Sequence, residues 1–165
     1  KSGLAVSAIL PDIRPAEIAD RVHADFAQAS DCRLAVILRS LEIMIGDDLR
    51  ARTRQFAINV IGLCLAMGTS DLVRLVRPQL LRAASGTAAN YRAACRSRSK
   101  REFVSRLATV IEEIDESEFW LDMLEHHQAG PADRLARLRQ EAVELRAVMA
   151  RSRSTAMANL KRRQL

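Results

Sequence analysis

The chain has 165 residues, of which 48% are hydrophobic and 28% charged, with only six glycines and four prolines. This balance excludes an intrinsically disordered chain and predicts one folded domain with an appendage. The net charge is +6, and three widely spaced cysteines, Cys32, Cys64 and Cys95, are typical of small buried side chains in a reducing compartment.

Residues 1–47 are predicted to form an N-terminal helical extension. Pro15 could open a short helix, and a second helix would begin near Asp31. Residues 1–48 carry 5 basic and 8 acidic side chains, and "IGDD" (45–48) indicates a turn that separates them from the rest of the chain. Met44 stands where a bare bundle would begin, so we interpret it as a candidate native start, which N-terminal sequencing of the natively expressed protein would test.

From residue 48 onward, apolar residues recur with the spacing of amphipathic helices. Asp48 is the predicted N-cap of the first helix, and Gly68 its stop. The predicted inward stripe of this helix is Leu49, Thr53, Phe56, Val60, Leu63 and Met67.

The second helix is expected from about Asp71 to Arg96. Its stripe is Val73, Val76, Leu80, Ala83, Thr87, Tyr91 and Ala94. Pro78 either kinks this helix or marks its real beginning. Gly86 lies in the small-residue segment "AASGTAAN" (83–90), which favours a close approach of two helices over a ligand-contacting break.

Ser99 and Glu102 have the spacing of a capping box and predict the start of a third helix. Its stripe is Phe103, Leu107, Val110, Ile114, Ser117, Leu121 and Leu124. Gly130 and Pro131 are predicted to end this helix and start a fourth. The fourth stripe is Leu135, Leu138, Ala142, Leu145 and Met149, followed by a basic tail at 161–165.

These elements predict an all-α fold, an antiparallel up-down-up-down four-helix bundle over residues 48–160 with an extra N-terminal helical segment. No apolar run reaches the ~18 residues of a membrane span, so we expect a cytoplasmic protein without a membrane partner.

The sequence contains no pattern that indicates a metal site or an enzyme active site. A di-metal carboxylate bundle needs carboxylates on all four helices and two Glu-x-x-His pairs, whereas the acids concentrate on the third helix. His126 and His127 are adjacent and point about 100° apart on a helix, which favours a surface role near the helix end. No nucleophile elbow or phosphate-binding glycine loop is present, so neither an enzyme nor a cofactor is expected.

Charge is strongly segregated along the chain. Residues 107–133 contain acids and no Lys or Arg, whereas residues 74–106 hold nine basic side chains and one acid. Two interpretations stay open: the arginines pair with the acidic third helix, within the bundle or across subunits, or they bind the phosphates of a nucleic acid. The predicted nucleic-acid-binding residues are Arg92, Arg96, Arg98, Lys100, Arg101 and Arg106. With few aromatic residues, such binding would follow backbone and shape more than base sequence.

The segment "QLLRAASGTAANYRAACRSRSKREFVSRLATVIEEIDESEFWLDML" (79–124) resembles one family. These are small bacterial four-helix-bundle proteins encoded in intervening sequences of large-subunit ribosomal RNA genes, related to the accessory variability proteins of diversity-generating retroelements. The resemblance rests on the QLLR lead-in, the Ser-Gly-Thr segment, Ala-Asn-Tyr, the basic junction and the Phe-Trp-Leu triplet; "RTRQFAINVIGL" (52–63) is also similar.

The resemblance implies a homo-oligomer, a ring of five copies with a central channel, and a non-enzymatic role with RNA or DNA or as adaptor to a reverse transcriptase. Glu116 and Trp120 match the family pattern and are interpreted as packing or subunit-contact residues. The alternative is a self-assembling scaffold whose arginines form ion pairs between subunits.

Overall fold

The computed structural model describes the backbone of residues 32–162 and the side chains of residues 46–162. The predicted helix that Pro15 would open lies outside the described residues. The chain divides into two compact units, Lys1–Ile45 and Gly46–Leu165. All the described side chains belong to the second unit.

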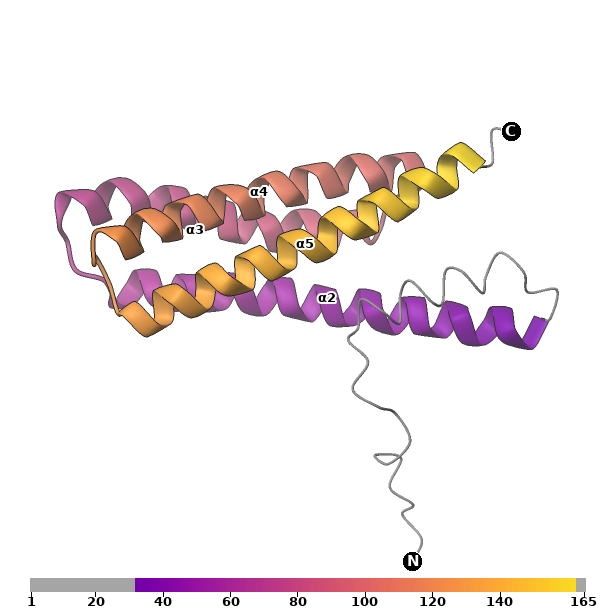
Figure 1. Ribbon diagram of the computed structural model, residues 1–165, viewed down its shortest axis with the longest axis horizontal. Coiled ribbons are helices and arrows are strands. Elements are labelled where there is room, and N and C mark those ends of the chain that lie inside the picture. Colours follow the sequence, from indigo (N-terminus) through magenta and orange to yellow (C-terminus); the bar gives the residue numbers. More distant parts are fainter. Residues whose placement is uncertain (1–31, 163–165) are drawn as a thin grey trace, which may run out of the picture. The chain divides into compact units, whose positions relative to one another are not determined.

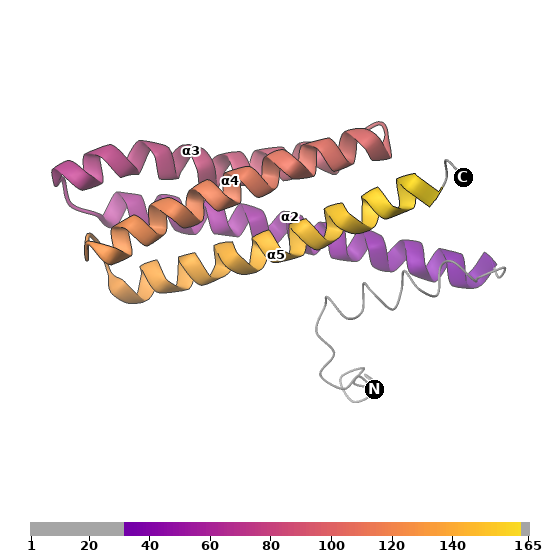
Figure 2. The same ribbon diagram turned by 45° about the horizontal axis from the view of Figure 1, so that its top comes forward.

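Four α-helices make up the described part of the chain: α2 (Cys32–Ala66), α3 (Asp71–Ala94), α4 (Lys100–His126) and α5 (Ala132–Arg162). No strand is assigned between residues 32 and 162. The α2–α3 and α4–α5 connections lie at one end of the bundle and the α3–α4 connection lies at the other (Figures 1 and 2). The predicted all-α, antiparallel four-helix architecture is therefore confirmed.

The core consists mainly of the predicted stripes, with Ala57, Cys64 and Ala84 buried beside them. Every member of the four stripes is buried, apart from Phe103, which is half-buried. The largest fully buried side chains come from all four helices and include Phe56, Leu80, Leu121 and Leu145. Periodicity alone located this core because a helix that buries one face repeats its apolar residues every three or four positions.

Polar members of the stripes satisfy their hydrogen bonds locally. Thr87 Oγ1 donates to the Ala83 carbonyl at 3.0 Å, and Ser117 Oγ donates to the Glu113 carbonyl at 2.8 Å. A hydroxyl that bonds to the preceding turn of its own helix is removed from water without losing its partner. Burial of these two residues therefore needs no polar partner from another helix.

The start of the first bundle helix differs from the prediction. Helix α2 is continuous through Gly46, Asp47 and Asp48, so Asp48 is not an N-cap and "IGDD" is not a turn. Glycine and aspartate weaken a helix by only about 1 kcal/mol or less each, and an Asp47–Arg50 ion pair spans one turn here. Met44 lies inside this helix, and whether it is a native start stays a prediction.

Helix α3 begins before Pro78. Ser70 is its N-cap, and the backbone N–H of Val73 donates to Ser70 Oγ at 3.4 Å. Pro78 lies inside the helix, close enough to its N-terminus that only the first turns precede it. Of the two alternatives left open by the sequence, a start at Pro78 is wrong.

Helix α4 ends earlier than predicted. It stops at His126, and Gln128 adopts a left-handed conformation with φ 52°. The Ala129 N–H donates to the Leu124 carbonyl at 2.9 Å and the Gln128 N–H donates to the Glu125 carbonyl at 3.0 Å, which together form a Schellman motif. A glutamine thus has the role that the sequence assigned to Gly130, whereas Pro131 does precede the first residue of α5, as predicted.

Helix α5 extends to Arg162, two residues past the boundary at 160 that the sequence predicted for the bundle. Its buried residues end at Met149, so the last thirteen residues of this helix form a half-exposed and exposed extension. Lys161 and Arg162, predicted as the start of a basic tail, are part of the helix.

Candidate nucleic-acid interface

The basic stretch predicted to bind nucleic acid forms the connection between α3 and α4. The Arg96 N–H donates to the Ala93 carbonyl at 3.1 Å and the Ser97 N–H donates to the Ala94 carbonyl at 3.0 Å, which closes the end of α3. Helix α4 then starts with Ser99 as N-cap, and the Glu102 N–H donates to Ser99 Oγ at 3.1 Å. The predicted capping function of Ser99 is confirmed.

Glu102 differs from the usual capping-box residue, whose side chain accepts the backbone N–H of the N-cap itself. Its carboxylate accepts the backbone N–H of Arg98 at 2.9 Å, one residue before the N-cap, and the Nε–H of Arg106 at 3.0 Å. These bonds, the one from Arg98 first, lower the pKa of Glu102 below its usual value. The only acid of the junction is therefore held in place by the basic residues on either side of it.

All six predicted basic residues are exposed. They follow one another along the end of α3, the α3–α4 connection and the start of α4. Arg92 is in the last turn of α3, Arg96 and Arg98 are in the connection, and Lys100 and Arg101 open α4. Arg106 follows one turn later and forms an ion pair with Glu102 at 2.9 Å. The other five have no ion pair within the described part of the chain.

Three arginines elsewhere in the bundle are paired with the acidic face of α4. Arg82 of α3 contacts Glu116 at 2.7 Å, Arg139 of α5 contacts Glu125 at 2.6 Å and Arg146 contacts Glu118 at 2.9 Å. Each such partly exposed pair stabilises the fold by less than about 1 kcal/mol. The prediction of ion pairs within the bundle is confirmed for these three residues, whereas Arg106 is the only one of the six junction residues with an ion pair in the described part of the chain.

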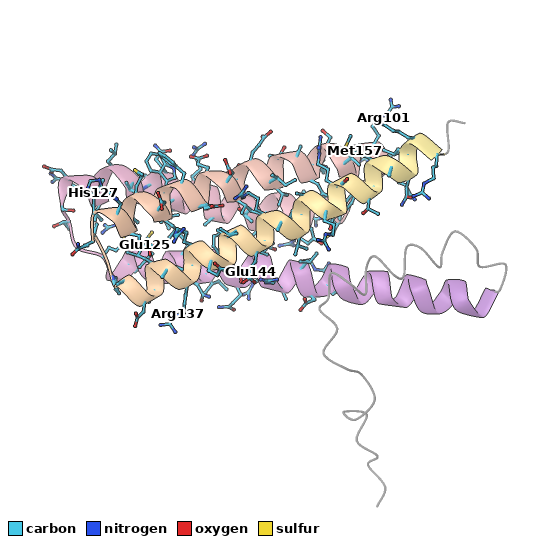
Figure 3. The ribbon with its side chains drawn as sticks, in the orientation of Figure 1. Arg101, Glu125, His127, Arg137, Glu144 and Met157 are labelled. Carbon is cyan, nitrogen blue, oxygen red and sulfur yellow. The ribbon has the colours of Figure 1, made fainter. Side chains whose placement is uncertain are left out.

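The C-terminal part of α5 adds basic residues at the same end of the bundle. Figures 1 and 2 place the end of α5 near the end where α3 connects to α4, and Figure 3 places Arg101 and Met157 toward this end and His127 and Arg137 toward the other. Residues 92–106 and 151–162 together hold ten basic side chains and one acid, Glu102. We call these two segments the basic end.

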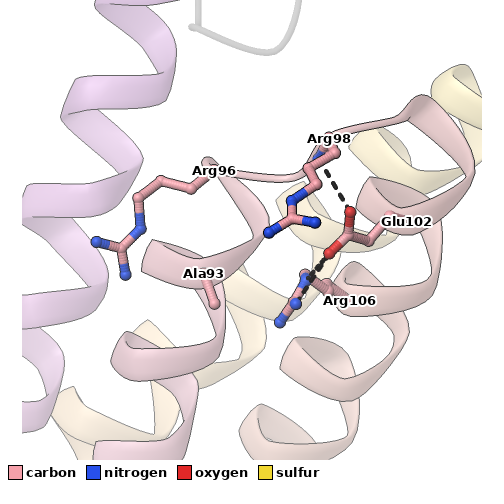
Figure 4. A pocket seen from close by; sticks show the side chains of 5 residues that line it. All are labelled: Ala93, Arg96, Arg98, Glu102 and Arg106. Carbon is pink, nitrogen blue, oxygen red and sulfur yellow. Dashed lines mark hydrogen bonds and ion pairs between the residues drawn. The ribbon is translucent and has the colours of Figure 1, made fainter.

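A pocket of about 450 Å³ opens at this junction. It is lined by Ala93, Arg96, Arg98, Glu102 and Arg106 (Figure 4). Ala93 belongs to α3 and the last two residues to α4, so the antiparallel packing of the two helices brings together the walls that the sequence separates. The three arginines were predicted to bind nucleic acid, but no sequence pattern indicated that they line one pocket.

Glu116 and Trp120, the predicted interface residues, contact each other on α4. Trp120 Nε1 donates to Glu116 Oε1 at 3.3 Å, and Arg82 bonds to the same oxygen at 2.7 Å. The neighbouring Phe119 packs edge-on against Trp120, with ring centroids 4.8 Å apart, and is 51% exposed. These contacts neither require nor exclude a second copy of the chain.

Helix α2 carries an exposed apolar surface that was not predicted from the sequence. Ile58, Ile61 and Leu65 of α2 are exposed, the last to 83%, and their spacing of three and four residues places them on one helix face. Leu75 of α3 is also exposed, to 63%. The pattern could have been found as a second apolar stripe on the helix, beside the one that forms the core.

The cysteines differ in their exposure. Cys64 is buried, as predicted, whereas Cys95 is exposed at the end of α3, so the prediction that the cysteines are buried is wrong for Cys95. The side chain of Cys32 lies outside the described residues. His126 and His127 are exposed at the end of α4, with ring centroids 5.0 Å apart.

Neither a metal-binding cluster nor a membrane span is found in the described part of the chain. Its side chains include no group of three or more His, Cys, Asp or Glu residues arranged to hold a metal ion. Between residues 32 and 162, no helix combines the length and apolar character of a transmembrane segment.

The fold and its charges define the class: an all-α helical bundle with one strongly basic end. A solved structure with a similar fold is that of a protein of unknown function from the S23 ribosomal protein family of Bacteroides thetaiotaomicron, with a TM-score of 0.55 and 21% sequence identity. The match covers 61% of this chain and 94% of that chain. Neither a protein-family model nor a curated protein matches this sequence. At this identity the likeness concerns the fold alone.

Proposed function

We propose that this protein is a non-enzymatic nucleic-acid-binding protein that uses the basic end of its bundle. The observation that carries the proposal is the separation of two kinds of arginine. Arg82, Arg139 and Arg146 pair with carboxylates of α4, whereas Arg96, Arg98 and Arg101 lie exposed without an ion pair among the described residues. Arginines whose role is to hold the bundle together would be expected to find carboxylates.

Clustered cations of this kind favour a polyanion as partner. Each phosphate neutralised by Arg or Lys releases condensed counterions, which makes binding favourable and dependent on salt. Ten basic side chains with one acid at a single end supply that charge. The only tyrosine, Tyr91, is buried and cannot stack on a base. Contacts are therefore expected chiefly with the sugar-phosphate backbone.

The proposal includes self-association, and an adaptor role beside a nucleic-acid enzyme such as a reverse transcriptase. The family resemblance of residues 79–124 implies a ring of five copies, and the exposed Ile58, Ile61 and Leu65 of α2 supply an apolar face of the kind that subunit contacts bury. Native mass spectrometry of the purified chain tests the number of copies, and a monomer at micromolar concentration would contradict this part.

Equilibrium binding to a structured RNA and to duplex DNA over a salt series tests the proposal. The test variant combines Arg96→Gln, Arg98→Gln and Arg101→Gln. The matched control combines Arg82→Gln, Arg139→Gln and Arg146→Gln, which removes the same charge from paired positions. The test variant is expected to bind more weakly and to reduce the slope of log K against log salt by roughly one for each phosphate that is no longer neutralised. The control is expected to keep the slope.

Absence of binding at low salt, or an equal loss in both variants, would overturn the proposal. The native mass of each variant is measured in parallel. If the test variant alone changes its oligomeric state, the arginines pair between subunits, and the alternative of a self-assembling protein scaffold, which the exposed apolar face of α2 favours, takes its place.

A further inference from the structure

The pocket at the α3–α4 junction has a charge that suits one kind of anion. Three of its five lining residues are arginines and one is a glutamate, so its lining carries a net charge of +2. A phosphate inside a nucleic-acid strand carries one negative charge, whereas a phosphate monoester carries about −1.5 to −2 near pH 7. The charge of the pocket therefore matches a terminal phosphate better than an internal one.

Glu102 shows how an anionic group is held at this place. Its two carboxylate oxygens accept one backbone N–H, from Arg98, at 2.9 Å and one guanidinium N–H, from Arg106, at 3.0 Å (Figure 4). Charged acceptors form strong bonds with donors of both types, and phosphate oxygens accept from them in the same way as carboxylate oxygens. A phosphate in the pocket would share the Arg106 guanidinium with Glu102.

One further guanidinium, that of Arg98, is directed toward Glu102 and Arg106, whereas that of Arg96 points away from them (Figure 4). Neither the Arg96 nor the Arg98 side chain has an ion pair among the described residues, and each offers five N–H donors in a planar fork. Arg98 extends from the α3–α4 connection toward the space between Ala93 and Arg106 (Figure 4). The small side chain of Ala93 leaves this space free for a group with the dimensions of a phosphate.

The number of phosphate oxygens also favours the end of a strand. A terminal phosphate monoester presents three acceptor oxygens, whereas an internal phosphate has a nucleoside on both sides and presents two. The exposed guanidiniums that line the pocket of about 450 Å³ therefore find more acceptors on a terminal phosphate.

We propose that this pocket binds the terminal phosphate monoester of a nucleic-acid strand, with Arg98 and Arg106 as its ligands and the charge of Arg96 beside them. The inference rests on the proposed function, because the strand that carries the phosphate is held by the remaining basic residues. Glu102 keeps Arg106 in position and lowers the positive charge of the pocket to the value that a dianion neutralises.

Single-stranded oligonucleotides of one sequence test this inference. One carries a 5′-phosphate, one a 3′-phosphate and one hydroxyl groups at both ends, and their dissociation constants are measured at one salt concentration with the full chain. At least one phosphorylated strand is expected to bind roughly tenfold more tightly than the hydroxyl strand. The strand that does so identifies the end that the pocket takes.

Two variants distinguish recognition of the terminal phosphate in the pocket from the general attraction of a nucleic-acid strand to the basic end. Arg98→Gln is expected to bring the ratio of the phosphorylated to the hydroxyl strand close to one. Arg101→Gln is the matched control, because Arg101 is exposed on α4 in the same junction and does not line the pocket. The control is expected to weaken all three strands by a similar factor and to keep their ratio.

Equal affinity of the natural chain for all three strands would overturn the inference and leave the proposed function standing. If no strand binds at low salt, the proposed function fails. The pocket is then tested separately, by measuring the melting temperature of the protein with and without inorganic phosphate. If phosphate raises the melting temperature of the natural chain and not that of the Arg98→Gln variant, a phosphate site in the pocket is supported. An equal rise in the natural chain and the variant, or no rise in either, would overturn the site.

Discussion

Gly86 of α3 leaves the space that the carboxyl group of Glu113 of α4 occupies. A Cβ atom at position 86 would lie 2.7 Å from Glu113 Cδ and 2.8 and 2.9 Å from its two oxygens. The predicted reason for the small residue, a close approach of two helices, is therefore incomplete, because a side chain fills the gap. One oxygen of Glu113, Oε2, is buried without a hydrogen-bond partner.

Gly86→Ala is expected to stabilise the protein by up to about 1 kcal/mol. Alanine is favoured over glycine in a helix interior by that amount. The atoms that a methyl group would meet are the far end of a flexible side chain, which can turn toward solvent without losing a bond to Oε2. Chemical denaturation of the two proteins at neutral pH measures the difference.

A double-mutant cycle with Glu113→Ala checks the cause. If Glu113 is the group that must move, Gly86→Ala gains more stability in the Glu113→Ala background than in the natural chain. A loss of stability in both backgrounds would show that the backbone of α4, and not this side chain, limits the space at position 86.

Glu113→Gln is expected to stabilise the protein near neutral pH by about 0.5 kcal/mol. Burial, and next the charge of Glu116, raise the pKa of Glu113 above its ordinary value. The folded chain therefore binds more protons than the unfolded one, and the natural protein loses stability as pH rises from the ordinary to the raised pKa. Glutamine has no charge to desolvate and escapes this loss.

The gain from Glu113→Gln should vanish in acid. Denaturation midpoints of both proteins at about pH 4 and about pH 7 measure this, since the ordinary pKa of Glu lies near the lower value. Asp122→Asn is a control at an exposed position of the same helix, away from Glu113. An equal gain at both pH values would contradict the assigned cause.

Gln128→Gly is expected to raise stability by roughly 0.5–1 kcal/mol. Residue 128 has φ 52°, a conformation that costs an L-residue energy and glycine almost none. The gain is partly offset because glycine is freer in the unfolded chain. Thermal denaturation checks the direction, and Gln128→Ala, which lacks the freedom of glycine, is expected to bring no such gain.

Cys95 is expected to react with a thiol reagent much faster than Cys64. Cys95 is exposed at the junction, whereas Cys64 is buried, and burial raises the pKa of its thiol. A chain with Cys32→Ser removes the third thiol, and mass spectrometry of a short labelling reaction then locates the label. Rapid labelling of both residues under native conditions would show that α2 opens near Cys64.

A label on Cys95 also provides a reporter of binding. A fluorophore there would lie beside Arg96, within the basic end, and its anisotropy should change when nucleic acid binds. The same label on a chain with Arg96→Gln, Arg98→Gln and Arg101→Gln is expected to respond less at equal nucleic-acid concentration.

The sequence determined where the helices of the bundle lie and which face each one buries. Apolar spacing placed Val76, Leu107 and Leu145 in the core, and the Ser99 and Glu102 spacing located the start of α4, because these properties depend on residues within one or two turns. The same local rules failed at Asp48 and Gly130, where glycine and aspartate signal a break too weakly to decide the outcome by themselves.

Only the tertiary structure decided which charges are satisfied. Arg82 and Arg98 are the same residue type in the same stretch of sequence, yet one meets Glu116 across 34 positions and the other faces a pocket. Partners that distant depend on how antiparallel helices align side by side, which no local pattern encodes. The aligned helices also put the carboxyl group of Glu113 against Gly86 and closed the walls around Ala93.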